Sequence, residues 1–120
     1  VKLVGSNWVG AHMEHRVNSG LEFLRARDIA RIQRRLGFTH VRLNYAVAML
    51  WDTQPVNLSS VAANPELAGK TPLEVFDACV EALTAEGLLV VINDHTSDYR
   101  WCCSLHDEQA LWYNSRWSES

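Results

Sequence analysis

Three apolar runs along the chain have the pattern of strands. Residues 1–8 (VKLVGSNW) are apolar and end in Gly, Ser and Asn, which indicates a short strand. Residues 38–46 (FTHVRLNYA) alternate between two faces, one of them carrying Val41 and Leu43, and predict a second strand. Residues 88–93 (LLVVIN) are apolar without alternation, which is typical of a parallel strand that is buried on both faces.

Two segments between these runs have helical spacing. In residues 24–37 the predicted apolar stripe is Ile29, Ile32 and Leu36, and Gly37 favours a left-handed helix end. In residues 71–87, Thr71 and Glu74 form a capping-box pattern at the start and Gly87 ends the segment. The predicted apolar stripe of this second helix is Leu73, Phe76, Cys79, Val80 and Leu83. A long loop, residues 49–70, separates the second strand from this helix.

The order β-α-β-α-β predicts the α/β class, with parallel and adjacent strands joined by right-handed crossovers. In such units functional residues lie where strands run into the following loops. The three predicted ends carry Asn7–Trp8, Asn44–Tyr45 and 93–95 (Asn-Asp-His). These residues are therefore the first candidates for a site.

All five tryptophans lie at or beyond these strand ends, and none lies in a helix stripe. Tryptophan offers a flat apolar face with a polar edge, which suits a ligand that has CH faces and hydroxyl rims. Sugars have that surface. The alternative is that the tryptophans only pack the loops.

Composition excludes several classes of partner. The chain has 120 residues, 48% of them hydrophobic, and a net charge of −3. This charge gives no electrostatic basis for binding nucleic acid, and no apolar run reaches the length needed for membrane insertion. The length suits one domain or part of one, and the sequence predicts no oligomeric state.

Several stretches resemble glycoside hydrolase family 5, the cellulase-like barrels. They are residues 5–14 (GSNWVGAHME), 36–49 (LGFTHVRLNYAVAM) and 64–103 (NPELAGKTPLEVFDACVEALTAEGLLVVINDHTSDYRWCC). The resemblance implies the first three β/α units of a TIM (β/α)8 barrel, left incomplete in this chain. It also implies hydrolysis of O-glycosidic bonds in β-linked glycans by a retaining mechanism, without a cofactor.

The resemblance assigns roles to particular residues. Arg42 would support the catalytic carboxylates, and His95 would bind the sugar at the cleavage point. Trp8 and Trp101 are the tryptophans best placed to contact the substrate, a polysaccharide or oligosaccharide. From the residues alone, the favoured interpretation of Arg42 is a surface or salt-bridging arginine, and that of His95 is a structural histidine.

The family's two catalytic glutamates follow the fourth strand, in an Asn-Glu motif, and end the seventh strand. Neither matches a position here, because Asn64-Pro65-Glu66 has the wrong order and lies in a loop. Residues 1–120 are therefore expected to be the N-terminal part of a catalytic barrel, without a second domain and inactive alone. The longer protein is expected to be secreted, its signal peptide lying outside this chain. The alternative is a stand-alone module that binds a saccharide without catalysis.

The His and Cys residues give no metal prediction. His12-Met13-Glu14-His15 contains the His-x-Glu of zinc deaminases, but no Pro-Cys-x-x-Cys follows. Cys102 and Cys103 are expected in a disulfide, either with each other or with another part of the protein. Cys79 is expected to be a buried thiol.

Overall fold

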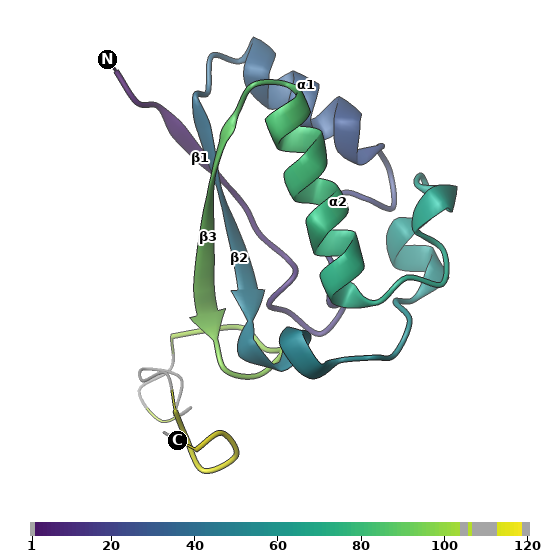
Figure 1. Cartoon of the computed structure of the whole chain (residues 1–120), viewed down its shortest axis with the longest axis vertical. Coiled ribbons are helices and arrows are strands. Elements are labelled where there is room, and N and C mark those ends of the chain that lie inside the picture. Colours follow the sequence, from purple (N-terminus) through teal and green to yellow (C-terminus); the bar gives the residue numbers. More distant parts are fainter. Residues whose placement is uncertain (1, 104–105, 107–112, 119–120) are drawn as a thin grey trace.

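The computed structural model describes residues 2–103, 106 and 113–118. Its centre is a sheet of three parallel strands, β1 (Gly5–Trp8), β2 (His40–Ala46) and β3 (Leu89–Thr96), in the order β1-β2-β3 (Figure 1). The predicted α/β fold with adjacent parallel strands is confirmed. The sheet is open, because β1 and β3 each have one edge that no described strand pairs with.

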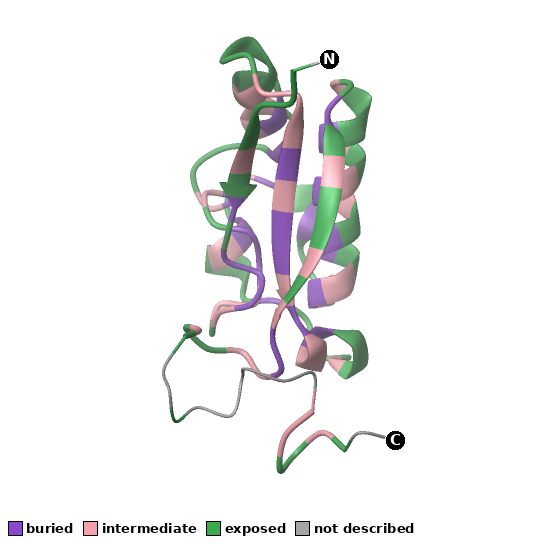
Figure 2. Cartoon of the chain, turned by 90° about the vertical axis from the view of Figure 1, so that its left-hand side faces the viewer, coloured by how far each residue is buried: buried purple, intermediate pink, exposed green. Residues whose placement is uncertain are grey.

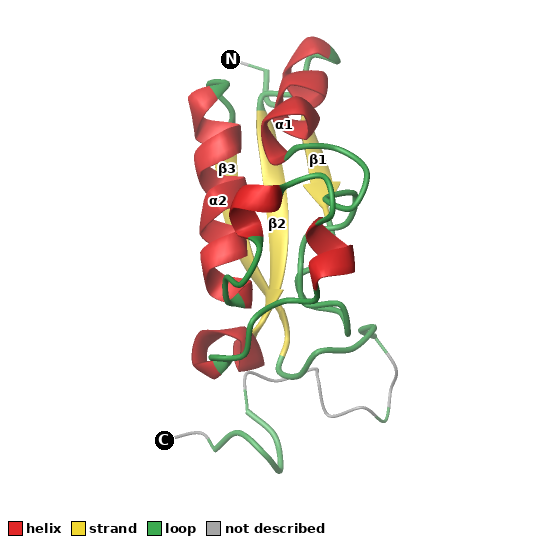
Figure 3. Cartoon of the chain, turned by 90° about the vertical axis from the view of Figure 1, so that its right-hand side faces the viewer, coloured by secondary structure: helices red, strands yellow, loops and turns green. Residues whose placement is uncertain are grey.

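Two helices cover one face of the sheet. They are α1 (Ala26–Arg35) and α2 (Pro72–Ala85), and both lie in front of the strands in Figure 3. The opposite face of the sheet is turned to the viewer in Figure 2 and no helix covers it. The predicted long loop contains three short 3-10 helices, at Val47–Trp51, Leu58–Val61 and Pro65–Leu67.

The core lies between the helices and the sheet. Trp8, Val41 and Leu43 come from the strands, and all are at most 5% exposed. Tyr45 packs edge-on against Phe76 of α2, with 6.1 Å between the ring centroids. Alternation along β2 therefore directs Val41, Leu43 and Tyr45 toward the helices, and Arg42 and Asn44 toward the open face.

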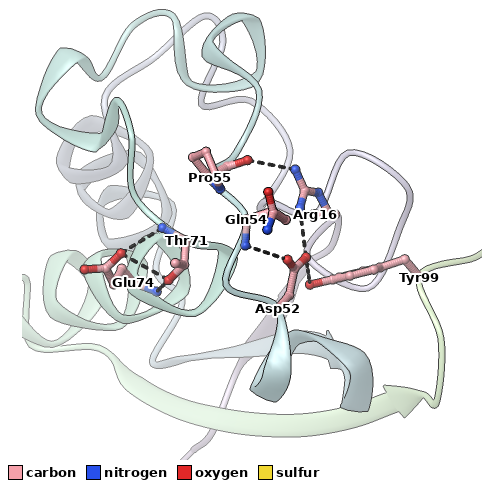
Figure 4. Close-up of polar contacts among 7 residues, drawn as sticks. All are labelled: Arg16, Asp52, Gln54, Pro55, Thr71, Glu74 and Tyr99. Carbon is pink, nitrogen blue, oxygen red and sulfur yellow. Dashed lines mark hydrogen bonds and ion pairs between the residues drawn. The ribbon is translucent and has the colours of Figure 1, made fainter.

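The helix ends follow local sequence signals. The side chain of Thr71 accepts a hydrogen bond from the Glu74 backbone N–H, and the Glu74 carboxylate accepts one from the Thr71 N–H (Figure 4). Gly37 and Gly87 follow the two helices with φ of +90° and +74°, a region that glycine adopts without strain. The predicted capping box and both glycine stops are confirmed.

The predicted buried stripe of α1 is partly wrong. Ala26 and Ala30 are the buried residues of this helix, whereas Ile32 is 46% and Leu36 is 70% exposed. Small side chains at the contact let a helix lie close to a sheet. Ile32 and Leu36 therefore lie on a side of α1 that no described element covers, whereas Ile29 is partly buried against the core, as predicted.

The prediction that β3 is buried on both faces is wrong. Leu89, Val91 and Ile92 are 62%, 48% and 61% exposed. β3 is an edge strand in the described sheet. Leu89 and Val91 lie on the face that no helix covers, whereas Ile92 pairs with Leu43 on the helix side and is exposed at the sheet edge. A continuous apolar run is typical of an interior strand, but no other described element lies beside the outer edge of β3 to bury its side chains.

β3 is also longer than predicted, and it carries a bulge. Its pairing with β2 runs regularly to Tyr45↔Asp94 and then jumps to Ala46↔Thr96, so that His95 is an extra residue on β3. A bulge bends its strand and changes the direction of the side chains around it. His95 therefore lies within β3 and not in the loop that follows the strand.

No helix among the described residues is long and apolar enough to cross a membrane.

Candidate functional site

Polar side chains gather where the strands run into their following loops. His12 comes from the loop after β1, Arg42 from β2 and His95 from the end of β3. The rings of His12 and His95 meet edge-on, with 4.6 Å between centroids and 81° between planes. The sequence predicted Arg42 and His95 as site residues but not His12, which was considered only as part of a metal motif. Its place four residues beyond a strand end is the signal that could have identified it.

The surroundings of His95 favour its neutral form. Burial lowers its pKa, and the positive charge of Arg42 on the neighbouring strand lowers it further, while Asp94 opposes the shift. The amide nitrogen of Asn93 lies 3.3 Å from His95 Nδ1. If that amide donates, the ring proton is on Nε2, which can then donate a hydrogen bond to a ligand hydroxyl.

His12 is more strongly shifted. It is 1% exposed, and burial, followed by the nearby His95, His15 and Arg42, lowers its pKa to about 4, although Glu14 acts in the opposite direction. Its Nδ1 has no hydrogen-bond partner among the described residues. His12 is therefore a neutral imidazole with unused hydrogen-bonding capacity beside His95.

An ion-pair network ties the three loops together (Figure 4). Arg16 donates to the carboxylate of Asp52 at 2.8 Å and to the Pro55 carbonyl at 2.9 Å, and the Tyr99 hydroxyl donates to Asp52 at 3.0 Å. Burial alone would raise the pKa of Asp52, but hydrogen bonds from Arg16, the Gln54 backbone and Tyr99 lower it. The network joins the loops after β1, β2 and β3 and fixes the site's surroundings.

The tryptophans divide into buried and exposed ones. Trp8 is 5% exposed, and its indole N–H donates to the Ser19 carbonyl at 2.8 Å, so its environment is that of a core residue. Trp101 is 70% exposed. Trp51 and Trp117 stack on each other, with ring centroids 5.0 Å apart, and Trp112 lies outside the described residues.

The stacked pair borders a cavity of 410 Å³. The cavity is lined by Ala48, Trp51, Asp52, Asp98, Tyr99, Arg116 and Trp117. Aromatic faces with carboxylate and guanidinium groups at their rim are the lining expected of a polar ligand with apolar faces.

Cys102 and Cys103 are bonded to each other, which is the first of the two predicted alternatives. Cys79 is free and buried, as predicted, and burial raises its pKa to about 12. A thiol with that pKa is not a nucleophile at neutral pH.

Asn64 has a structural role. Its side-chain oxygen accepts from the Ala26 N–H, which begins α1, and its nitrogen donates to the carbonyls of Leu21 and Leu24. Glu66 is exposed in the 3-10 helix Pro65–Leu67. The side chain of Asn64 thus fastens the loop that follows β2 to the start of α1.

The chain is similar to known proteins over most of its length. No family model matches it. A glycosyl hydrolase 5 family protein from Chamaecyparis obtusa is 33% identical over 123 residues, covering 89% of this chain and 22% of that protein. The major extracellular endoglucanase of Xanthomonas campestris pv. campestris is 31% identical over 121 residues, covering 100% of this chain and 24% of that protein.

Solved structures agree on the fold. The catalytic domain of the major endoglucanase from Xanthomonas campestris pv. campestris superposes with a TM-score of 0.80 at 29% identity, covering 98% of this chain and 32% of that one. A cellotetraose complex of an endocellulase from Pyrococcus horikoshii gives a TM-score of 0.81 at 24% identity, covering 98% of this chain and 30% of that one.

These similarities identify the three-stranded sheet as part of a TIM barrel. Over nearly its whole length the chain is similar to a part of a glycosyl hydrolase 5 family protein and of an endoglucanase, as the sequence resemblance indicated. It spans about a quarter of the length of these curated relatives.

Proposed function

We propose that the longer protein carrying this chain hydrolyses β-linked glycans, as an endoglucanase-type glycoside hydrolase. The supporting observation is that Arg42 and His95 lie on neighbouring parallel strands, close enough for their charges to interact, in a chain similar to endoglucanases. The carboxyl edge of parallel strands is where barrel enzymes hold their substrates. The substrate is a polysaccharide or oligosaccharide of β-linked sugars.

His95 binds a hydroxyl of the sugar at the cleavage point. Because its pKa is lowered, the neutral ring is favoured over the charged one, and the neutral ring donates through one nitrogen. Arg42 provides a fixed positive charge that holds a catalytic carboxylate in its ionised form. Exposed Trp101 contacts the substrate, while the burial of Trp8 favours a packing role for that residue.

The two catalytic carboxylates come from the rest of the barrel. Residues 1–120 are then the N-terminal part of one catalytic domain, and this part alone does not cleave its substrate. A retaining mechanism needs two carboxyl groups roughly 5–5.5 Å apart, one as acid/base and one as nucleophile. We further propose that the protein acts outside the cell, as the name of the Xanthomonas relative says of that enzyme.

The experiment measures kcat/KM for the full-length protein on carboxymethyl cellulose, mannan and β-glucan, with His95→Ala as the test variant. Loss of a hydrogen bond that strengthens in the transition state should lower kcat/KM about 100-fold. His40→Gln is the matched control. His40 begins β2 and its ring lies over Gly5, at the N-terminal end of the strands, whereas His95 lies at their C-terminal end.

The control should keep kcat/KM near the wild-type value, and both variants should keep the wild-type far-ultraviolet spectrum. Equal losses in the two variants would contradict a specific role for His95. An active protein whose first product has inverted anomeric configuration, seen by NMR, would contradict the retaining mechanism.

A further inference from the structure

Three metal-ligating side chains meet at the end of β3. One ligand atom each from His95, Cys102 and Cys103 lies within 4.8 Å of the others. His12 lies next to this cluster through its ring contact with His95, and its buried Nδ1 has no hydrogen-bond partner among the described residues. The proposed hydrolytic function uses His95 but neither cysteine.

We propose that reduction of the Cys102–Cys103 disulfide turns this cluster into a binding site for Zn²⁺. The two thiolates and the His95 imidazole are the ligands, and His12 is adjacent as the source of a fourth. Two sulfur and two nitrogen ligands are a common zinc set, and zinc prefers neutral imidazole and ionised thiols. In the oxidised chain the sulfurs are bonded to each other and no thiolate exists, so the site is closed.

The chemistry requires an external dithiol. A dithiol reductant gives two electrons and two protons to the disulfide, forming two thiols, and itself closes to a disulfide. Zinc then displaces the two thiol protons, so two protons leave for each ion bound. Cys103 is exposed, so the reductant can reach the disulfide bond from the side of this residue.

The distances are compatible with a small adjustment. With Zn–S near 2.3 Å and Zn–N near 2.0–2.1 Å, ligand atoms in a tetrahedral site lie about 3.3–3.8 Å apart. The present separations are within 4.8 Å, so the imidazole needs a movement of about 1 Å relative to the sulfurs, and the two sulfurs, which are bonded to each other at present, must also separate once the disulfide is reduced. If the Asn93 side chain turns so that its amide oxygen faces His95 Nδ1, that oxygen accepts the Nδ1 proton and orients the ring for zinc at Nε2, as partners of metal-bound histidines do.

The experiment is a titration of the full-length protein with Zn²⁺ against a chromogenic chelator, before and after dithiothreitol treatment and anaerobic removal of the reductant. Co²⁺ is the second probe, since thiolate ligands give it a charge-transfer band. The test variants are Cys102→Ser/Cys103→Ser and His95→Ala. The controls are Cys79→Ala, which removes a thiol elsewhere, and His15→Ala, which removes a nearby histidine outside the cluster. Circular dichroism checks the fold of each.

The reduced wild type should bind one more equivalent of Zn²⁺ than the oxidised form and show the Co²⁺ band. The double serine variant should lose both, and His95→Ala should bind at least about 10-fold more weakly, since even indirect partners of a metal cost that much. The controls should bind as the wild type does. Equal zinc binding before and after reduction, or unchanged binding in either test variant, would overturn the site. The readout is metal binding, so it is independent of hydrolysis.

Discussion

A histidine that is buried beside other histidines resists protonation, and His12 is such a residue. Its pKa falls from 6.5 to about 4 in the folded protein. The unfolded chain therefore binds this proton more readily than the folded one, so the free energy of unfolding decreases as pH falls from about 6.5 to about 4. The full effect of such a shift is about 3 kcal/mol.

We expect His12→Asn to reduce this acid sensitivity. Denaturant unfolding of the full-length wild type and variant at neutral pH and at the lower end of that range measures it. As the pH falls, the free energy of unfolding of the wild type should decrease by up to about 3 kcal/mol more than that of the variant, because asparagine does not titrate. Parallel pH profiles would show that His12 is not held neutral by the fold.

Asp52 accepts hydrogen bonds from Arg16, Tyr99 and the Gln54 backbone. We expect Asp52→Ala to destabilise the protein by about 2–3 kcal/mol, since it leaves a partly buried guanidinium and a hydroxyl without their acceptor. The control, Glu66→Ala, removes an exposed carboxylate of the same charge and should change stability by less than about 0.5 kcal/mol. Similar losses in the two variants, measured by urea unfolding, would contradict the role of the network.

At the scale of the element, α2 begins at the capping box of Thr71 and Glu74. Thr71→Ala should destabilise the protein by about 1 kcal/mol, because two backbone N–H groups lose or weaken their partners. Thr84→Ala is the matched control. Its hydroxyl donates to the Val80 and Glu81 carbonyls within the helix, which already have helical partners. If thermal unfolding shows the two variants equally stable, the cap contributes nothing.

Helix ends could be predicted from the sequence because their signals are local. Thr71, Gly37 and Gly87 each act on neighbouring backbone, so their effect does not depend on the rest of the fold. Buried faces could not be predicted equally well. Whether Ile32 or Leu89 is covered depends on which elements lie beside α1 and β3, and that is a property of the assembled molecule.

The candidate site, like the fold, could be predicted only in part from the sequence. Arg42 and His95 both lie on strands that the sequence predicted, so their place on neighbouring parallel strands could be expected, although Arg42 pairs with Val91, four residues before His95. His12 and the Asp52 network come from loops, whose paths no periodicity describes. The bulge at His95 was equally invisible, since it appears only when the register with β2 is known.

At the scale of the molecule, the described sheet has two unpaired edges, and on its face without a helix Leu89 and Val91 are exposed beside polar residues such as Arg42. Unpaired edges and exposed apolar strands favour association between chains. We expect the isolated 120-residue chain to be marginally stable and prone to aggregation. Calorimetry and size-exclusion chromatography measure this. A monomer with one sharp cooperative unfolding transition would instead favour a complete module that binds saccharides.

The central claim is that this chain is the part of a β-glycan hydrolase that binds and positions the substrate. Release of reducing ends from carboxymethyl cellulose, mannan and β-glucan by the full-length protein and by the isolated chain tests it most directly. The full-length protein should release reducing ends from at least one of these substrates, and the isolated chain should match a mock preparation because it lacks the two carboxylates. An inactive full-length protein, or an active chain whose activity disappears with His95→Ala, would contradict the account.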